Sequence, residues 1–112
     1  MRDVSAIKRI LADIENWGGA DILVNNAGIQ KTALLADLDA ATWDAIIAVN
    51  LSGVFHTMRL ALPQMAKRGY GRVVNIASVL GIVASVAKAT YCASKFGLAG
   101  MAKVAALEYA AK

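Results

Sequence analysis

Residues 75–95, NIASVLGIVASVAKATYCASK, contain the pattern around which the chain is organised. A β-branched stretch ends at Ser78, a loop with Gly81 follows, and residues 91–95, YCASK, open an apolar helix. Tyr91 and Lys95 are four residues apart, so they share one face of that helix. An ammonium beside a phenol stabilises the ionised phenol. We therefore predict that Tyr91 gives and takes a proton near neutral pH.

Two short stretches predict parallel strands. Residues 21–25, DILVN, are too short and too continuously apolar for an amphipathic helix, which is typical of a strand buried in a parallel sheet. Residues 72–77, RVVNIA, predict the second buried strand. The loop Asn25-Asn26-Ala27-Gly28 leaves the first strand. Ligands of open α/β sheets collect at the carboxyl ends of the strands. We therefore expect the functional site there.

Helical periodicity covers three ranges, 4–17, 40–68 and 91–110. Asp39 is the expected N-cap of the second helix, which is either continuous or divided near Asn50. Gly97 and Gly100 make the third helix narrow, so another helix can approach it closely. The resulting order, α-β-α-β-α, predicts a doubly wound α/β pattern with too few strands for a stable open sheet.

The composition excludes several classes of protein. The 112 residues are 58% hydrophobic with a mean hydropathy of +0.52, which predicts one small domain, 1–112, with some surface buried against another chain. The charge of +4 comes from dispersed Lys and Arg, so we expect a solvated face and no nucleic-acid partner. With one Cys and one His, neither a disulfide nor a metal site is expected. No apolar run reaches the roughly 18 residues of a membrane span, so we expect a cytoplasmic protein.

Ser78, Tyr91 thirteen residues later, and Lys95 together resemble the signature of the short-chain dehydrogenase/reductases. The loop 25–28 and Asn50 within VNL match two further motifs of that family, and the resemblance covers essentially the whole chain. It implies an incomplete, Rossmann-like three-layer α/β fold with two parallel strands. It also implies a truncated domain that lacks the N-terminal βαβαβ unit and the C-terminal strands.

The resemblance implies four catalytic roles. Tyr91 exchanges a proton with the substrate oxygen while NAD or NADP exchanges a hydride. Lys95 supports the ionised tyrosine and holds the nicotinamide ribose. Ser78 hydrogen-bonds the substrate oxygen, and Asn50 holds a water in the proton relay.

The same resemblance implies cofactor contacts. Asn25, Ala27 and Gly28 cap the strand and line the adenosine side of the cofactor, and Tyr91 and Lys95 contact its nicotinamide end. No G-x-G-x-x-G or G-x-x-x-G-x-G string occurs in the sequence. We therefore expect weak or absent NAD(P) binding by this chain.

Substrate residues follow from a narrower resemblance. Gln30 ends the stretch NNAGIQ, and Lys88 lies three residues before Tyr91. In both positions the chain resembles the 3-hydroxybutyrate dehydrogenases, in which this Gln and this Lys bind the substrate carboxylate. With Ser78, they imply a small hydroxy or oxo acid as substrate. Leu80 departs from the pattern, because that subgroup usually has a His at this position.

Two alternatives remain open. Residues 85–88, SVAK, match the S-x-x-K string of some serine hydrolases, so Ser78 or Ser85 with Lys88, Tyr91 and Lys95 could form a cofactor-independent ester hydrolase. The other alternative is an inactive oligomeric remnant. Whichever function holds, we expect a homodimer or homotetramer, because the resemblance implies that helices 40–68 and 91–110 pair with their symmetry mates.

Overall fold

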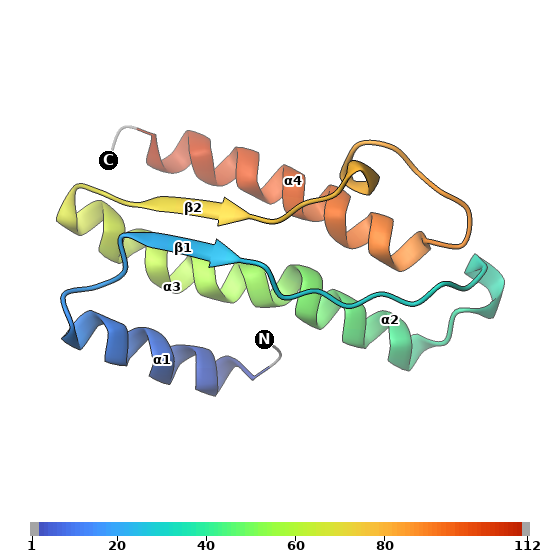
Figure 1. Cartoon of the computed structure of the whole chain (residues 1–112), viewed down its shortest axis with the longest axis horizontal. Helices are drawn as coiled ribbons and strands as arrows, with labels where there is room; N and C mark the ends of the chain where they lie inside the picture. The colour runs from blue at the N-terminus through green and yellow to red at the C-terminus, as the bar shows by residue number, and fades with distance from the viewer. Residues whose placement is uncertain (1–2, 111–112) are drawn as a thin grey trace.

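The structure is a computed structural model that describes residues 3–110; the ends of the predicted 1–112 domain lie outside the described residues. Its main elements are α1 (Val4–Asn16), β1 (Ile22–Asn25), α2 (Ala40–Ile47), α3 (Gly53–Arg68), β2 (Arg72–Asn75) and α4 (Ala89–Tyr109) (Figure 1). A π-helical segment, Ala48–Ser52, joins α2 to α3, and short 3-10 turns occupy Leu35–Asp37 and Val79–Gly81. The predicted order of helices and strands is confirmed, and the long helix is continuous from Ala40 to Arg68 with the π-helical segment around Asn50.

The two strands form a parallel pair, as predicted. Ile22 lies opposite Arg72 and Asn25 opposite Asn75. Parallel strands need a long crossover, which α2 and α3 supply. The α/β class with two parallel strands is therefore confirmed. β2 ends at Asn75, two residues before the predicted end of the strand.

One face of the sheet packs on helices and the other is open. Val73 packs against the core between α3 and α4, and Leu23 lies beside it in register. Successive side chains along a strand point to opposite faces of the sheet, so the chain neighbours of Leu23 and Val73 face away from these helices. Ile22, Val24 and Val74 are 60%, 55% and 45% exposed. The prediction of fully buried strands is thus wrong for this face, because within residues 3–110 no layer covers it.

The core joins α3 to α4. Its buried members are Val54, Met58 and Leu98, with Leu51 and Val73 among the partly buried side chains packed around them. A Cβ atom on Gly97 would lie 3.1 Å from a Leu51 methyl, so the predicted close helix approach is confirmed there. The same position on Gly100 has no atom within 4 Å, so Gly100 faces open space.

Polar contacts define the ends of the helices. The Asp39 carboxylate accepts a hydrogen bond from the Thr42 backbone at 3.4 Å, which confirms the predicted N-cap. The side-chain hydrogen bond with Thr42, and to a lesser extent the bond from the Thr42 backbone, lowers the pKa of Asp39. Gly69 ends α3 in the left-handed region, with φ of 79°. Arg68 pairs with Glu15 at 3.0 Å and connects α3 to α1. That pair is partly exposed and contributes little free energy.

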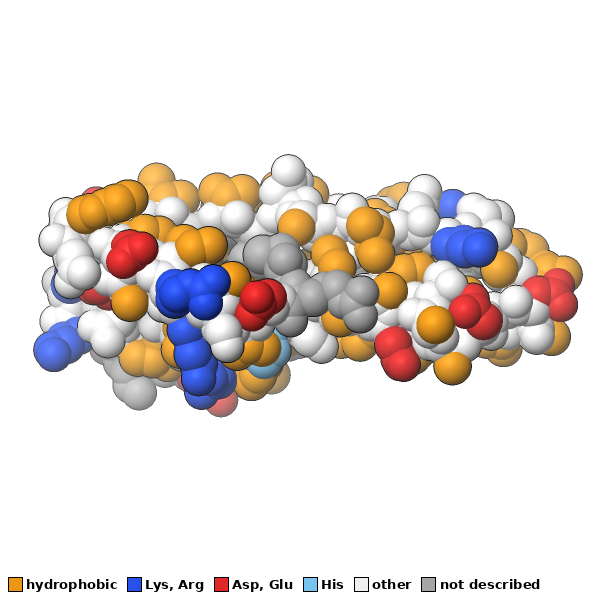
Figure 2. All heavy atoms as spheres, turned by 90° about the horizontal axis from the view of Figure 1, so that it is seen from below, with side chains coloured by type: hydrophobic (Ala, Val, Ile, Leu, Met, Phe, Trp, Pro, Cys, Tyr) orange, Lys and Arg blue, Asp and Glu red, His pale blue; other side chains and the backbone are white. Residues whose placement is uncertain are grey.

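The continuous helical stretch Ala40–Arg68 is long and apolar enough to cross a membrane by length and composition. Core helices meet the same criterion, and this stretch packs against α1, β1 and α4. Figure 2 shows that, on the face seen from below, Lys, Arg, Asp and Glu side chains are interspersed with hydrophobic ones. On that face the charged groups of either sign do not form one continuous patch.

The core predicts a large effect of truncating Leu98. This side chain is 1% exposed, so Leu98→Ala should lower the free energy of unfolding by about 2–5 kcal/mol through lost burial and the cavity left behind. Urea unfolding followed by circular dichroism measures the change. Leu35→Ala is the matched control, because Leu35 is 74% exposed, and its effect should stay below about 0.5 kcal/mol. Equal effects of the two substitutions would contradict the packing described.

Candidate active site

The carboxyl ends of the two strands are linked by their last residues. Asn25 donates a hydrogen bond from Nδ2 to Asn75 Oδ1 at 2.8 Å, and Thr57 of α3 donates to Asn25 Oδ1 at 2.6 Å. The Ile76 backbone N–H also bonds the Asn25 carbonyl at 3.0 Å. Asn25 is buried, so these bonds form in a region of low dielectric, where they are strong. They fix the point at which both loops leave the sheet.

Asn50 attaches the loop after β1 to the long helix. Its Nδ2 donates to the Ile29 carbonyl at 2.7 Å, and its Oδ1 accepts from the Ile29 N–H at 2.8 Å. The side chain lies in the π-helical segment and is buried. π-helical turns often occur at functional sites. The Asn50 side chain thus holds the Ile29 backbone by two hydrogen bonds, and we call this pair of bonds the clamp. The predicted role of Asn50 in holding a water stays a prediction.

Ser94 extends this clamp to the turn that carries Tyr91. The second Nδ2 hydrogen of Asn50 points to Ser94 Oγ at 3.4 Å, and Ser94 donates to the Tyr91 carbonyl at 2.8 Å. Ser94 is fully buried. We did not select Ser94 from the sequence, although a serine three residues after Tyr91 on an apolar helix was a usable signal.

Lys95 links Tyr91 to the end of the second strand. Its Nζ donates to the Ile76 carbonyl at 2.9 Å and lies 5.4 Å from the centroid of the Tyr91 ring. The lysine is 6% exposed and has no carboxylate partner among residues 3–110. The ammonium therefore lies beside the Tyr91 ring with the Ile76 carbonyl as its hydrogen-bond acceptor.

Ser78 lies in the loop between β2 and α4 and precedes the 3-10 turn Val79–Gly81. Its Oγ accepts a hydrogen bond from the Leu80 N–H at 3.2 Å, which leaves the hydroxyl proton available for another acceptor. The turn after Ser78 packs on α4, because a Cβ on Gly81 would lie 3.1 Å from the Lys95 carbonyl. Ser78, Tyr91 and Lys95 are thus attached to the same end of the sheet.

The predicted cofactor-binding residues differ in whether their polar groups are already hydrogen-bonded within the chain. The Asn25 side chain is occupied by Asn75 and Thr57, so its structural role is visible. Ala27 and Gly28 are exposed in the loop. A Cβ on Gly28 would lie 3.6 Å from Asn50 Oδ1, which is ordinary contact.

Gln30 and Lys88 come together at the rim of this end of the sheet. Lys88 Nζ donates to Gln30 Oε1 at 3.2 Å and to Thr32 Oγ1 at 3.0 Å. Thr32 was not selected from the sequence. Ser85 is exposed, and the Lys88 ammonium bonds Gln30 and Thr32 rather than Ser85 within the described part of the chain. This geometry does not favour the S-x-x-K hydrolase.

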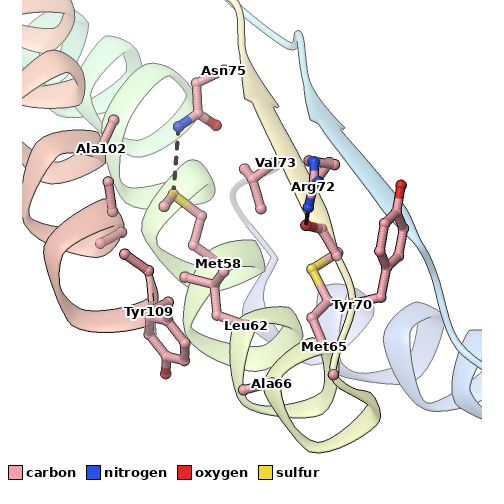
Figure 3. A pocket seen from close by; sticks show the side chains of 15 residues that line it. Met58, Leu62, Met65, Ala66, Tyr70, Arg72, Val73, Asn75, Ala102 and Tyr109 are labelled. Carbon is pink, nitrogen blue, oxygen red and sulfur yellow. Dashed lines mark hydrogen bonds between the residues drawn. The ribbon is translucent and has the colours of Figure 1, made fainter. Parts of the chain in front are cut away.

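A separate cavity lies between α3, α4 and β2 and has a volume of about 450 Å³ (Figure 3). Its walls include Met58, Leu62 and Val73, and none of the predicted catalytic residues lines it. Figure 3 shows Asn75 and Met58 at one end of it, joined by a hydrogen bond of 3.6 Å to the Met58 sulfur. The candidate site is thus defined by the network at the strand ends, not by this cavity. Within residues 3–110 no group of three or more His, Cys, Asp and Glu side chains gathers as a metal site.

The family model described as short chain dehydrogenase matches residues 1–112. The chain therefore belongs to the short-chain dehydrogenase family. Over 95 residues it is 56% identical to a D-beta-hydroxybutyrate dehydrogenase of Cupriavidus necator, which covers 85% of this chain and 37% of that protein. A D-beta-hydroxybutyrate dehydrogenase of Rhizobium meliloti is 50% identical, over 96% of this chain and 41% of the relative.

A 3-oxoacyl-acyl-carrier-protein reductase, FabG of Thermotoga maritima, is 41% identical over 98% of this chain and 45% of its own length. Among solved structures, an Agrobacterium tumefaciens protein provisionally named gluconate dehydrogenase superposes with a TM-score of 0.93 and 36% identity, over 97% of this chain and 44% of that one. The chain thus spans 37 to 45% of the length of these curated relatives. The family predicted from the motifs is confirmed, and the fold is a partial Rossmann-like one.

The clamp predicts a local effect of removing the Asn50 amide. Asn50→Ala leaves the Ile29 N–H and carbonyl without partners and should destabilise the chain by about 1–3 kcal/mol. Exchange of the Ile29 amide hydrogen, followed by NMR, should become faster than in the unsubstituted chain. Asn26→Ala is the control, because Asn26 is exposed in the same loop. Unchanged protection of Ile29 would show that the clamp does not hold the loop.

Proposed function

We propose that the chain carries the proton-transfer and substrate-orienting part of an oxidoreductase that interconverts a hydroxyl and a ketone with NAD or NADP. The observation that carries this proposal is the position of Lys95, which bonds the end of β2 and lies beside the Tyr91 ring. Membership of the family supports the reaction class. The names of the Cupriavidus necator and Rhizobium meliloti relatives support a small hydroxy acid as substrate.

Proton transfer in this proposal belongs to Tyr91. In the oxidising direction its phenolate oxygen takes the proton of the substrate hydroxyl, and in the reducing direction it returns that proton. The Lys95 ammonium stabilises the phenolate by opposite charge. Ser78 donates its free hydroxyl proton to the substrate oxygen, which requires the Ser78 and Tyr91 hydroxyls to reach one atom. A bound nicotinamide supplies the hydride acceptor or donor.

The residues present fit the nicotinamide end of such a cofactor. Lys95 uses one ammonium hydrogen on the Ile76 carbonyl and retains two for a ribose hydroxyl. The exposed loop at Ala27 and Gly28 is available to the adenosine side. The glycine-rich pyrophosphate loop has no counterpart in this sequence, so the residues here fit only part of the cofactor.

Substrate recognition is assigned to Gln30 and Lys88. Their mutual hydrogen bond holds the ammonium beside the Gln30 amide, whose NH₂ group is left to donate. A carboxylate accepts from both groups, and charge-assisted hydrogen bonds are the stronger kind. The Leu80 side chain supplies no donor, so Gln30 and Lys88 bind the carboxylate in the proposal.

The Tyr91 role predicts a large loss of turnover. Tyr91→Phe keeps the ring and removes the acid–base oxygen, so oxidation of 3-hydroxybutyrate should fall about 10²- to 10⁴-fold. NADH or NADPH absorbance measures the rate of the chain in millimolar NAD+ or NADP+. The same assay is applied to a chimera, the Cupriavidus necator relative in which residues 3–110 of this chain replace the matching segment. Tyr70→Phe is the control, because Tyr70 lines the separate cavity. A Tyr91→Phe chimera with unreduced turnover would overturn the assignment.

The same preparations separate the alternatives. Hydrolysis of a p-nitrophenyl ester that falls with Ser85→Ala would favour the hydrolase. Absence of both reactions in the chimera as well as in the chain would favour the inactive remnant. The proposed oxidoreductase instead predicts Tyr91-dependent turnover of the hydroxy acid in the chimera.

We further propose that a cytoplasmic homo-oligomer forms through helices 40–68 and 91–110. Exposed apolar side chains on α4 support this: Phe96, Val104 and Leu107 are 46%, 53% and 84% exposed. Phe96, Gly100 and Val104 are spaced by four residues and share one helix face. Gly100 has open space above it, which leaves room for a second helix to approach.

A charged residue on the α4 face of Phe96, Gly100 and Val104 should dissociate the oligomer into single chains. Val104→Glu places an unpaired carboxylate in the proposed contact, so the sedimentation coefficient at micromolar concentration should fall to that of a monomer. Val86→Glu is the matched control, because Val86 is exposed in the loop before α4 and lies outside the proposed contact. A monomeric unsubstituted chain would contradict the proposal.

A further inference from the structure

The loop after β1 and the loop before α4 are joined side by side at the rim of the site. The Ala33 N–H donates to the Ala87 carbonyl at 3.1 Å, and Ala33 pairs with Lys88 in an isolated parallel bridge. Ala87 has a φ of 62°, a left-handed conformation that is unfavourable for a residue with a Cβ. The backbone around Lys88 is therefore held in a specific arrangement against the segment that carries Gln30 and Thr32.

The Lys88 ammonium is held without being neutralised. It donates to two uncharged oxygens, Gln30 Oε1 at 3.2 Å and Thr32 Oγ1 at 3.0 Å. An ammonium has three hydrogens, so one is left over. No carboxylate within residues 3–110 pairs with Lys88. The ammonium thus has no anionic partner in the described part of the chain and one donor left for an anion.

We infer that Thr32 is a positioning residue that aims the Lys88 ammonium at the carboxylate of the substrate. This inference rests on the proposed function and adds to it the residue that sets the direction of the lysine. A lysine side chain has many rotamers, and holding it in one costs conformational entropy. Thr32 is β-branched and stiff at χ1, so its oxygen is a better-defined anchor than the flexible Gln30 amide.

The test compares three side chains at position 32. Thr32→Val keeps the branched shape and removes the hydroxyl, whereas Thr32→Ser keeps the hydroxyl. The dissociation constants of 3-hydroxybutyrate and of its uncharged methyl ester are measured on the 112-residue chain by NMR titration. We expect Thr32→Val to weaken binding of the acid about tenfold, because the lysine side chain then loses its rotamer freedom only on binding, and to leave binding of the ester unchanged. Thr32→Ser should bind the acid within about twofold of the unsubstituted chain.

The outcomes separate the inference from the function on which it rests. If the unsubstituted chain prefers the acid to the ester and Thr32→Val binds the acid equally well, the role of Thr32 is overturned while the carboxylate site stands. If the unsubstituted chain binds the acid no better than the ester, the carboxylate site itself fails, and the inference fails with it. Backbone amide spectra check that each variant folds, and Thr32→Ala serves as the hydroxyl-free variant if Thr32→Val does not.

Discussion

The two hydrogen bonds between the Asn50 amide and the Ile29 backbone are the contact on which the rest of the site depends. A side-chain amide presents one donor and one acceptor side by side, so it pairs with a single residue's N–H and carbonyl as another strand would. That amide belongs to the π-helical segment Ala48–Ser52, a kind of turn that is frequent at functional sites. Because Ser94 connects the same amide to the Tyr91 carbonyl, one side chain joins the loop after β1, the long helix and α4.

Lys95 is a buried charged side chain, a feature that opposes the stability of a hydrophobic core. Burial of an ammonium is unfavourable unless it is paired, and a single backbone carbonyl compensates for only part of that cost. Deviations of this kind are expected at functional sites. The surrounding packing holds the lysine in place: Gly81 contacts its backbone, and α4 is fixed by the core around Leu98.

Local sequence patterns predicted the fold well because each pattern has a local physical cause. The Asp39 cap depends on neighbouring residues only and is present, and the predicted irregularity near Asn50 is a π-helical segment. The open face of the sheet was missed, since a continuous apolar run does not reveal whether the covering layer belongs to the described chain. Thr32 and Ser94 were missed for a different reason. Their contacts with Lys88 and Asn50 span 56 and 44 residues of the chain, which a motif search cannot see, and only the spacing of Ser94 from Tyr91 was a local signal.

The strand pairing also bears on how the chain reaches this structure. Ile22 pairs with Arg72, so the sheet closes a loop that contains all of α2 and α3. The entropy of closing that loop must be lost before the short strands gain any hydrogen bonds, whereas the helices form from local contacts. We therefore expect α2, α3 and α4 to assemble first and the sheet to pair last. In that order, the strand ends that carry Asn25, Asn75 and Ile76 become organised only in the final step. The site is then the part of the molecule most exposed to partial unfolding, which would appear as early loss of amide protection at Ile76.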